Sequence, residues 1–206
     1  MIVPLVIPAT HALGQTFVKI DSSIVCTAGG YSQSGSWGDY NNDGYPDLFI
    51  ANGGRIDATN RNFLFLNNGS WRFSRITEGE IVNLTSTSGS GGGAWGDYDN
   101  DGDLDIFVSF FNNQNNHLYR NNGDRTFTRI IDDTVSNDGG DSSGPSWVDY
   151  DNDGDLDLYV VNDYIPPPQK NYLYRNNGNG HFTKITEGPI VNDLAPNHLA
   201  ASWADV

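Results

Sequence analysis

Apolar residues in this chain occur in short runs of three or four positions, separated by polar stretches rich in Gly, Asn and Asp. The clearest runs lie at 48–50, 106–108 and 158–160, and each follows an acidic residue directly. Their β-branched and aromatic side chains favour β-strands. No stretch shows the sustained helical period with capping signals that a helix needs. The pattern therefore predicts an all-β protein with little or no helix.

The pattern repeats along the chain. The tryptophans at 37, 95, 147 and 203 are separated by 58, 52 and 56 residues. A Phe-x-x-Ile sequence that begins at 17, 73, 127 and 182 recurs at intervals of 56, 54 and 55 residues. Two independent markers in register define a repeat unit and predict a repeat architecture.

Each unit predicts four strands. The first ends at the Trp, the second is the apolar run, and the third lies at 63–66, 118–120 or 172–175. The third strand ends at an Asn-Gly pair, which tolerates φ > 0 and suits a tight hairpin turn, and the Phe-x-x-Ile strand closes the unit. Repeated four-stranded units of this length are typical of β-propeller blades; a β-sandwich with coincidentally similar loops is the competing interpretation.

The predicted organisation is an N-terminal segment at 1–16 followed by propeller repeats at 17–206. The repeats divide into 17–72, 73–126, 127–181 and a partial copy at 182–206. Three blades with partial copies at both ends would expose strand edges, which proteins normally pair or cover. Two explanations stay open: the chain is a fragment of a longer propeller, or copies associate into a homo-oligomer through their open blade edges.

A nine-residue acidic loop joins the first two strands of each unit. Carboxylates so close together would raise one another's pKa, but alternate loop positions can converge on a hard cation that prefers oxygen ligands. Gly at position six allows the sharp bend with φ > 0. We expect side-chain ligands at positions one, three, five and nine and a backbone carbonyl at position seven. These residues are Asp39, Asn41, Asp43, Tyr45 and Asp47; Asp97, Asp99, Asp101, Asp103 and Asp105; and Asp149, Asp151, Asp153, Asp155 and Asp157.

The ligand chemistry of these loops favours calcium over magnesium, at about three ions per chain, since a loop of protein oxygens matches calcium's flexible coordination number of six to eight. The absence of His and Cys disfavours transition metals. The loops are not EF-hands, because position twelve is Ile50, Val108 or Val160 where a bidentate Glu belongs. The first site is expected to be the weakest, because Asn41 replaces a carboxylate.

Composition narrows the possible partners. The 206 residues carry a formal net charge of −15, and thirteen of the 26 acidic residues lie in the three loops. This charge argues against a nucleic-acid partner, which would need a basic face. No apolar run approaches the roughly 20 residues of a membrane span. The single cysteine, Cys26, excludes an intramolecular disulfide and is expected to be a small buried residue.

The sequence also resembles a known family. Trp-Gly-Asp-Tyr-Asp-Asn-Asp-Gly-Asp-Leu-Asp before an apolar strand, then Leu-Tyr-Arg-Asn-Asn-Gly and Phe-Thr-x-Ile, is similar to the FG-GAP/VCBS repeats that build the propeller of integrin α subunits. The resemblance covers residues 17–206 and implies a calcium-binding propeller. Asn41 and Tyr45 depart from the family pattern in the first loop.

Three hypotheses for function follow. The first is a non-catalytic module, extracellular or at the cell surface, whose structural calcium supports adhesion or the binding of a glycan or protein. Its ligand-binding candidates are aromatic residues of the divergent connectors, namely Phe110, Phe111 and Tyr164. The second is a lyase-like enzyme that acts on polysaccharides, although no nucleophile motif or phosphate-binding loop is present. The third is a structural subunit that assembles through its open blade edges.

Overall fold

The computed structural model describes residues 23–53, 61–70, 72–84, 89–162, 169–192 and 199–204. Within these ranges the chain forms twelve strands, grouped in three antiparallel sheets of four strands each. The first sheet holds β1 (Ser32–Gly38), β2 (Asp47–Asn52), β3 (Phe63–Asn67) and β4 (Phe73–Ile76). The second holds β5 (Ser90–Gly96), β6 (Asp105–Phe110), β7 (His117–Asn121) and β8 (Phe127–Ile130). The third holds β9 (Ser142–Val148), β10 (Asp157–Asn162), β11 (Tyr172–Asn176) and β12 (Phe182–Ile185).

The all-β prediction is confirmed. Each sheet is a meander in which strands consecutive in the chain pair with one another. In the described ranges helix is confined to single turns, α1 (Ile24–Thr27), α2 (Pro189–Asn192) and the 3-10 turn η1 (Thr134–Ser136). No helix in the described residues has the length and hydropathy needed to span a membrane.

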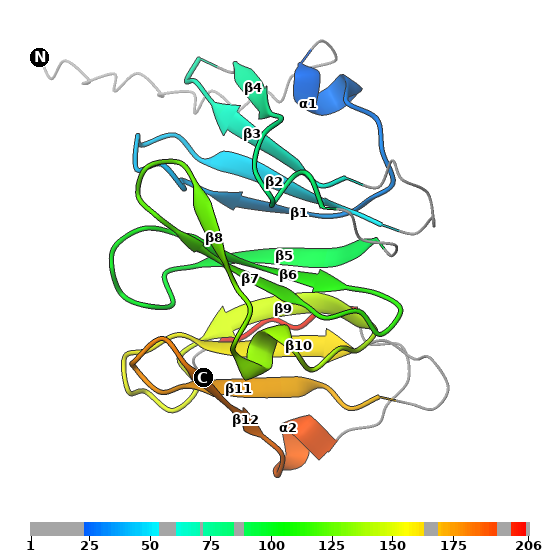
Figure 1. Cartoon of the computed structure of the whole chain (residues 1–206), viewed down its shortest axis with the longest axis vertical. Helices are drawn as coiled ribbons and strands as arrows, with labels where there is room; N and C mark the ends of the chain where they lie inside the picture. The colour runs from blue at the N-terminus through cyan, green and yellow to red at the C-terminus, as the bar shows by residue number, and fades with distance from the viewer. Residues whose placement is uncertain are drawn as a thin grey trace, which may run out of the picture.

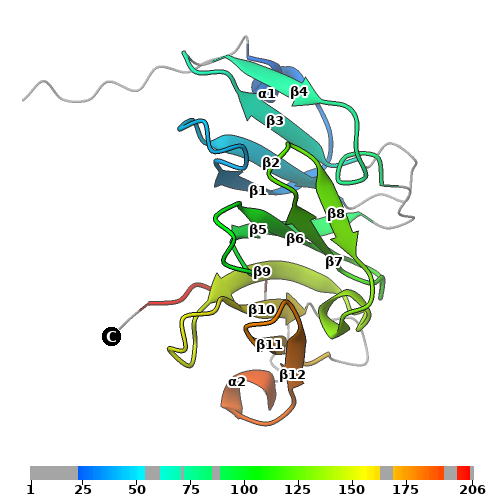
Figure 2. The ribbon, with the colours of Figure 1, turned by 60° about the vertical axis from the view of Figure 1, so that its left-hand side comes forward.

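The three sheets stand one after another in chain order along the long axis of the molecule (Figures 1 and 2). Their first strands are neighbours, since β1 contacts β5 and β5 contacts β9. In the described part of the chain the sheets do not close into a ring, so they form consecutive blades of an open propeller.

Apolar side chains fill the two junctions between sheets. Phe49, Ile106 and Tyr119 belong to the core between the first and second sheets. Phe107, Leu158 and Tyr174 belong to the core between the second and third. Every residue of β6 and β10 is buried. The first and third sheets cover the two faces of β6, whereas the second sheet covers one face of β10 and Val191 of α2 with Ala201 lies against the other. This is why their sequences are continuous apolar runs and do not alternate.

The repeated tryptophan joins each sheet to the preceding one. Trp95 stacks on Tyr40 with ring centroids 5.9 Å apart, and its Nε1 donates to the Ser36 carbonyl at 3.2 Å. Trp147 repeats this on Tyr98, at 6.3 Å, and donates to the Ala94 carbonyl at 3.0 Å. The same tryptophan contacts therefore recur at both junctions.

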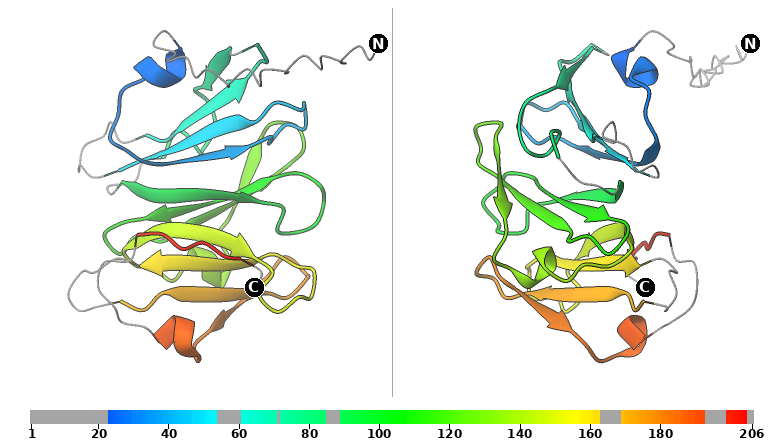
Figure 3. Two further views of the ribbon diagram at one scale, coloured as in Figure 1. Left: turned by 180° about the vertical axis from the view of Figure 1, so that it is seen from behind. Right: turned by 45° about the vertical axis from the view of Figure 1, so that its right-hand side comes forward.

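Residues 199–204 run beside β9 (Figure 3, left). Trp203 donates from Nε1 to Ser146 Oγ at 3.1 Å and lies edge-on to Tyr159, with ring centroids 5.5 Å apart. Its N–H thus bonds to residue 146, the counterpart of the Ala94 that accepts from Trp147, but through a side-chain hydroxyl. This segment therefore resembles the first strand of a further blade.

Two local predictions need correction. The Asn-Gly glycines do have positive φ, 72° at Gly123 and 69° at Gly178. However, residues 122–126 and 177–181 make five-residue loops and not tight two-residue turns. The expected burial of Cys26 is also wrong, because Val25 of the single-turn α1 packs against the first sheet whereas Cys26 is exposed.

Candidate metal loops

The three acidic loops, residues 39–47, 97–105 and 149–157, lie at the same end of the sheets, on the left in Figure 1. Each joins the first strand of its sheet to the second. The glycines at position six have φ of 87°, 93° and 95°, as predicted. The asparagines at position four, Asn42, Asn100 and Asn152, also have positive φ, between 56° and 60°. Two left-handed residues in quick succession curl the backbone around the carboxylates.

The carboxylate at position one organises each loop. Asp97 accepts the backbone N–H groups of Asp101 at 3.1 Å and Gly102 at 3.0 Å, one on each oxygen. Asp39 and Asp149 make the same pair of bonds, at 2.7 to 3.1 Å. These bonds fix the loop's shape with backbone donors, so the sequence pattern produces the same geometry three times.

The carboxylate at position nine is completely buried in all three loops. Asp105 accepts the N–H of Asn121 at 2.8 Å and that of Tyr98 at 3.1 Å. Burial, the main cause, raises the pKa of Asp105 to about 8. Burial likewise raises the pKa of Asp47 and of Asp157 to about 6. Each site thus combines a carboxylate desolvated inside the fold with carboxylates near its surface.

The structure brings several predicted ligands together. In the second loop, oxygens of Asp97, Asp99 and Asp105 all lie within 4.8 Å of one another. In the third loop the same holds for Asp149, Asp151 and Asp153. Among the described residues, no such carboxylate trio forms in the first loop, where Asn41 stands at position three. Both trios include the carboxylate at position three, which the first loop lacks, so the relative strength of the sites stays a prediction.

Orphaned oxygens show that the loops fit a cation. Asp99 Oδ1 in the second loop and Asp47 Oδ2 in the first are buried, and neither accepts a hydrogen bond. Burial also raises the pKa of Asp99, so the loop penalises its bare charge. Buried acceptors without donors are costly unless a cation or a proton meets them. The donor set, oxygens only, can hold a hard divalent cation.

Sequence reasoning missed a connection between neighbouring loops. Asn42 donates to Asp103 Oδ1 at 2.7 Å, and Asn100 donates to Asp155 Oδ1 at 2.7 Å. The position-four amide of one loop therefore holds the position-seven carboxylate of the next. The signal was visible as an Asn at position four of every loop. It also explains how position seven could offer its backbone carbonyl while its side chain is engaged elsewhere.

A second missed residue is the Asn that ends the third strand of each sheet. Asn121 is buried and donates from Nδ2 to the Leu104 carbonyl at 3.1 Å in its own loop. The same amide donates to the Tyr40 carbonyl at 2.7 Å in the preceding loop. Asn176 repeats both bonds one sheet later. Its signal is the first Asn of the repeated Asn-Asn-Gly, whereas the turn prediction uses only the second Asn and the Gly.

The pKa values of the position-nine carboxylates predict how pH acts on the metal-free protein. The unfolded chain loses these protons near pH 4. The folded chain keeps them up to about pH 6 or about pH 8. The folded state binds more protons in this window, so the free energy of unfolding should fall as pH rises from about 4 to about 8. Urea unfolding of chelator-treated protein at about pH 5 and about pH 8 measures the difference; equal stability at both would contradict the prediction.

The three aromatic residues predicted to contact a ligand lie in different environments. Phe110 is 1% exposed and packs in the core between the first two sheets, so its ring is not available to a surface ligand. The polar Ser109 before Phe110 suggests a strand with one exposed face, but both faces of β6 are covered. Phe111 is partly buried at the end of β6. Tyr164 lies outside the described residues.

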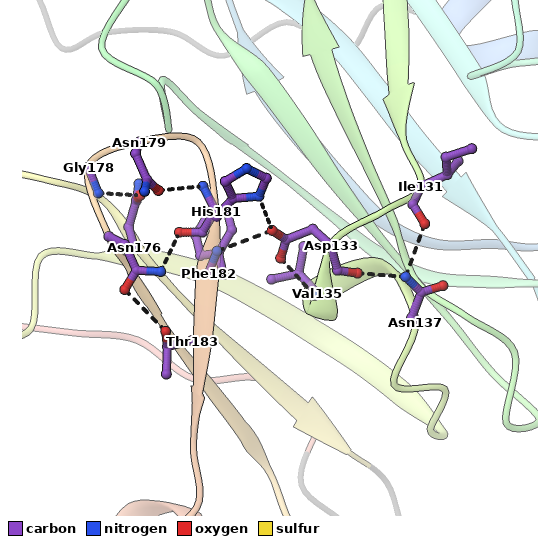
Figure 4. Close-up of polar contacts among 11 residues, drawn as sticks. Ile131, Asp133, Val135, Asn137, Asn176, Gly178, Asn179, His181, Phe182 and Thr183 are labelled. Atoms are coloured by element: carbon purple, nitrogen blue, oxygen red, sulfur yellow. Dashed lines mark hydrogen bonds and ion pairs between the residues drawn. The ribbon is translucent and has the colours of Figure 1, made fainter.

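A His–Asp pair lies at the junction of the second and third sheets, where its hydrogen bonds join two segments of the fold (Figure 4). His181 Nδ1 lies 3.0 Å from Asp133 Oδ2. The same carboxylate, 5% exposed, accepts the N–H of Phe182 at 3.3 Å and, through Oδ1, that of Val135 at 3.3 Å. Asp133 thus ties η1 to the hairpin that leads into β12.

Comparisons with known proteins bear on the family. No curated protein matches the chain. A solved structure from a study of specific recognition of non-reducing terminal N-acetylglucosamine by an Agrocybe aegerita lectin is similar, with a TM-score of 0.47 and 21% identity. The match covers 74% of this chain and 37% of that chain, so the chain spans little more than a third of the lectin's length. The FG-GAP-like repeat model matches residues 39–108 and 105–160, which is more than half of the sequence. The chain therefore belongs to the FG-GAP-like repeat family.

Proposed function

We propose that this chain is a non-catalytic, calcium-binding propeller module that works outside the cell or at its surface and binds a glycan or protein partner. The observation that carries the proposal is the trio of Asp97, Asp99 and Asp105 in the second loop. One member is fully buried, and another has a buried oxygen without a donor. A divalent cation would neutralise the buried carboxylate and would give the unpaired oxygen a partner.

The role proposed for calcium is structural. Asp105 is both the ninth loop residue and the first residue of β6, and it also bonds to Asn121 at the end of β7. A cation held at this carboxylate would tie the loop to two strands of the sheet. Ion binding would then contribute to the free energy of folding. Calcium suits the loops better than magnesium, because it accepts six to eight oxygen ligands in flexible geometry.

The location and the binding role rest on general grounds. Loops of this kind, outside the EF-hand pattern, suit the millimolar calcium found outside cells. Connectors on a rigid β scaffold are the usual carriers of recognition. The connectors β2–β3, β6–β7 and β10–β11 differ from one another in length and composition, whereas the strands repeat. Such divergence on a constant scaffold is typical of a binding module.

Calcium should stabilise the protein strongly. At a free concentration about 100 times the dissociation constant, one site adds about 2.7 kcal/mol to the free energy of unfolding. Thermal unfolding with chelator, with calcium and with magnesium measures this effect. The proposal fails if the melting temperature in calcium equals the melting temperature in chelator.

The three sites should differ in affinity. The first should bind most weakly, because its Asn41 contributes no charge. The three variants Asp39→Ala, Asp97→Ala and Asp149→Ala are titrated with calcium in a calorimeter. The Asp39 variant should lose only the weakest calcium-binding phase. Loss of the tightest phase in that variant would contradict the assignment.

A further inference from the structure

A cavity of about 490 Å³ opens at the junction between the first and second sheets. On the side of the first sheet it is lined by Glu80, Asn83 and Leu84, which follow β4. On the side of the second it is lined by the amide side chains of residues 113–115, His117 of β7 and Arg129 of β8. The β6–β7 connector lies at the opposite end of the sheet from the acidic loop. The cavity is therefore separate from the candidate metal loops.

The ionisable groups that line the cavity carry no net charge. Glu80 Oε1 and Arg129 Nη1 form an ion pair at 3.1 Å. His117 is 9% exposed, and its Nδ1 lies 3.0 Å from the Tyr119 hydroxyl. Burial lowers the pKa of His117 to about 3, so its ring is neutral at physiological pH. The remaining polar groups are amides. The cavity thus offers many hydrogen-bonding groups without a charge to attract an ion.

Part of this lining is held in place, and part is open to a ligand. Asn83 is fixed, because it accepts from Arg61 Nη1 at 2.9 Å and donates to the Thr77 carbonyl at 2.9 Å. In contrast, Gln114 and Asn115 line the cavity with exposed amide side chains, which a ligand can reach.

The corresponding corner of the next junction has different side chains. Tyr172 and Lys184 occupy the positions in β11 and β12 that His117 and Arg129 occupy in β7 and β8. There Lys184 Nζ lies 3.4 Å from the centre of the Tyr172 ring and 2.8 Å from Asp138 Oδ2. A larger aromatic ring stands there in place of the imidazole. At the first junction Leu84 stands in place of Asp138, and Arg129 pairs with Glu80 instead.

We propose that the cavity binds a neutral saccharide of one or two rings. A sugar both donates and accepts hydrogen bonds, which matches an amide-rich wall, and a volume of a few hundred cubic ångströms is usual for small-ligand sites. An anionic ligand would compete with Glu80 for Arg129 and would meet a chain of net charge −15. This inference rests on the binding role proposed above and names its ligand class.

The test is saturation-transfer NMR and calorimetry on the full chain in millimolar calcium. The probes are the methyl glycosides of glucose, galactose, mannose and N-acetylglucosamine, with glucuronate as the acidic probe. We expect a neutral glycoside to bind and glucuronate not to bind. His117→Tyr, which introduces the ring found in the third sheet, should weaken binding by about tenfold or more. Gln114→Ala should weaken it by about threefold, through the loss of an exposed hydrogen bond.

Control measurements distinguish the possible failures. Asn179→Ala removes an exposed amide from the third sheet's hairpin and should leave the affinity unchanged. If no neutral glycoside binds although calcium still raises the melting temperature, the cavity inference is wrong and the calcium-stabilised module stands. Binding of glucuronate alone, or undiminished binding by a folded His117→Tyr variant, would also overturn the inference. Failure of calcium to stabilise the chain would count against the proposed function itself.

Discussion

Asp105→Ala should lower the free energy of unfolding by about 3 kcal/mol even in the presence of chelator. The side chain is fully buried and accepts two backbone N–H groups, from Asn121 at 2.8 Å and Tyr98 at 3.1 Å. Alanine leaves both donors buried without an acceptor and opens a small void. In calcium the loss should be larger, because the cation would also lose a ligand. Urea unfolding with and without calcium measures both parts.

Two further variants separate the hydrogen bonds from the charge. Asp103→Ala, in the same loop, removes a partly exposed carboxylate that accepts one bond from Asn42, so it should cost about 1 kcal/mol. Asp105→Asn keeps one acceptor and removes the buried charge. One of the two buried N–H groups then faces the amide nitrogen, so this variant should lie between wild type and Asp105→Ala in chelator, and it should gain little from calcium. If Asp105→Ala were no worse than Asp103→Ala in chelator, the buried carboxylate would not hold the sheet together as we infer.

Trp147→Ala should lower the free energy of unfolding by about 3 to 5 kcal/mol. The indole stacks on Tyr98, contacts Phe182 at 6.2 Å between ring centroids and donates to the Ala94 carbonyl at 3.0 Å. Truncation therefore removes the aromatic contact between the second and third sheets. It also leaves the Ala94 carbonyl without its donor.

The chain supplies a matched control at the same repeat position. Trp37 is 58% exposed, and Phe73 is its aromatic neighbour, at 6.1 Å. Trp37→Ala should therefore cost less than about 1 kcal/mol. Chemical denaturation of both variants in calcium gives the comparison. Similar losses at the two positions would show that the tryptophan stabilises its own sheet and not the junction.

The order and type of the strands could be predicted because their signals are local. The apolar run at 106–108 and the Phe-x-x-Ile strand at 127–130 are correctly placed, since each is bounded by turn residues and repeats in register. The acidic loops could be recognised for the same reason. The positive φ of Gly102 follows from its place in the nine-residue pattern. Which oxygens hold a cation stays a prediction.

Contacts between sheets could not be predicted, because they join residues far apart in the sequence. The bonds from Asn121 to Tyr40 and from Trp147 to Ala94 depend on how one blade lies against the next. The burial of Phe110 depends on the same packing. The cavity lined by His117 also lies between two sheets, so its walls come from segments that are far apart in the sequence.

The amide of Asn121 belongs to two repeats at once, through its bonds to Leu104 and Tyr40, and Asn176 repeats the arrangement. This has a consequence for how such a chain can evolve. Duplication or deletion of one complete repeat restores the same junction on both sides. Such events can therefore change the number of blades without requiring a new interface. A crossover inside a repeat separates an asparagine from one of its two loops. Selection should therefore favour recombination in units of whole blades, and each blade inherits the surface that its neighbour requires.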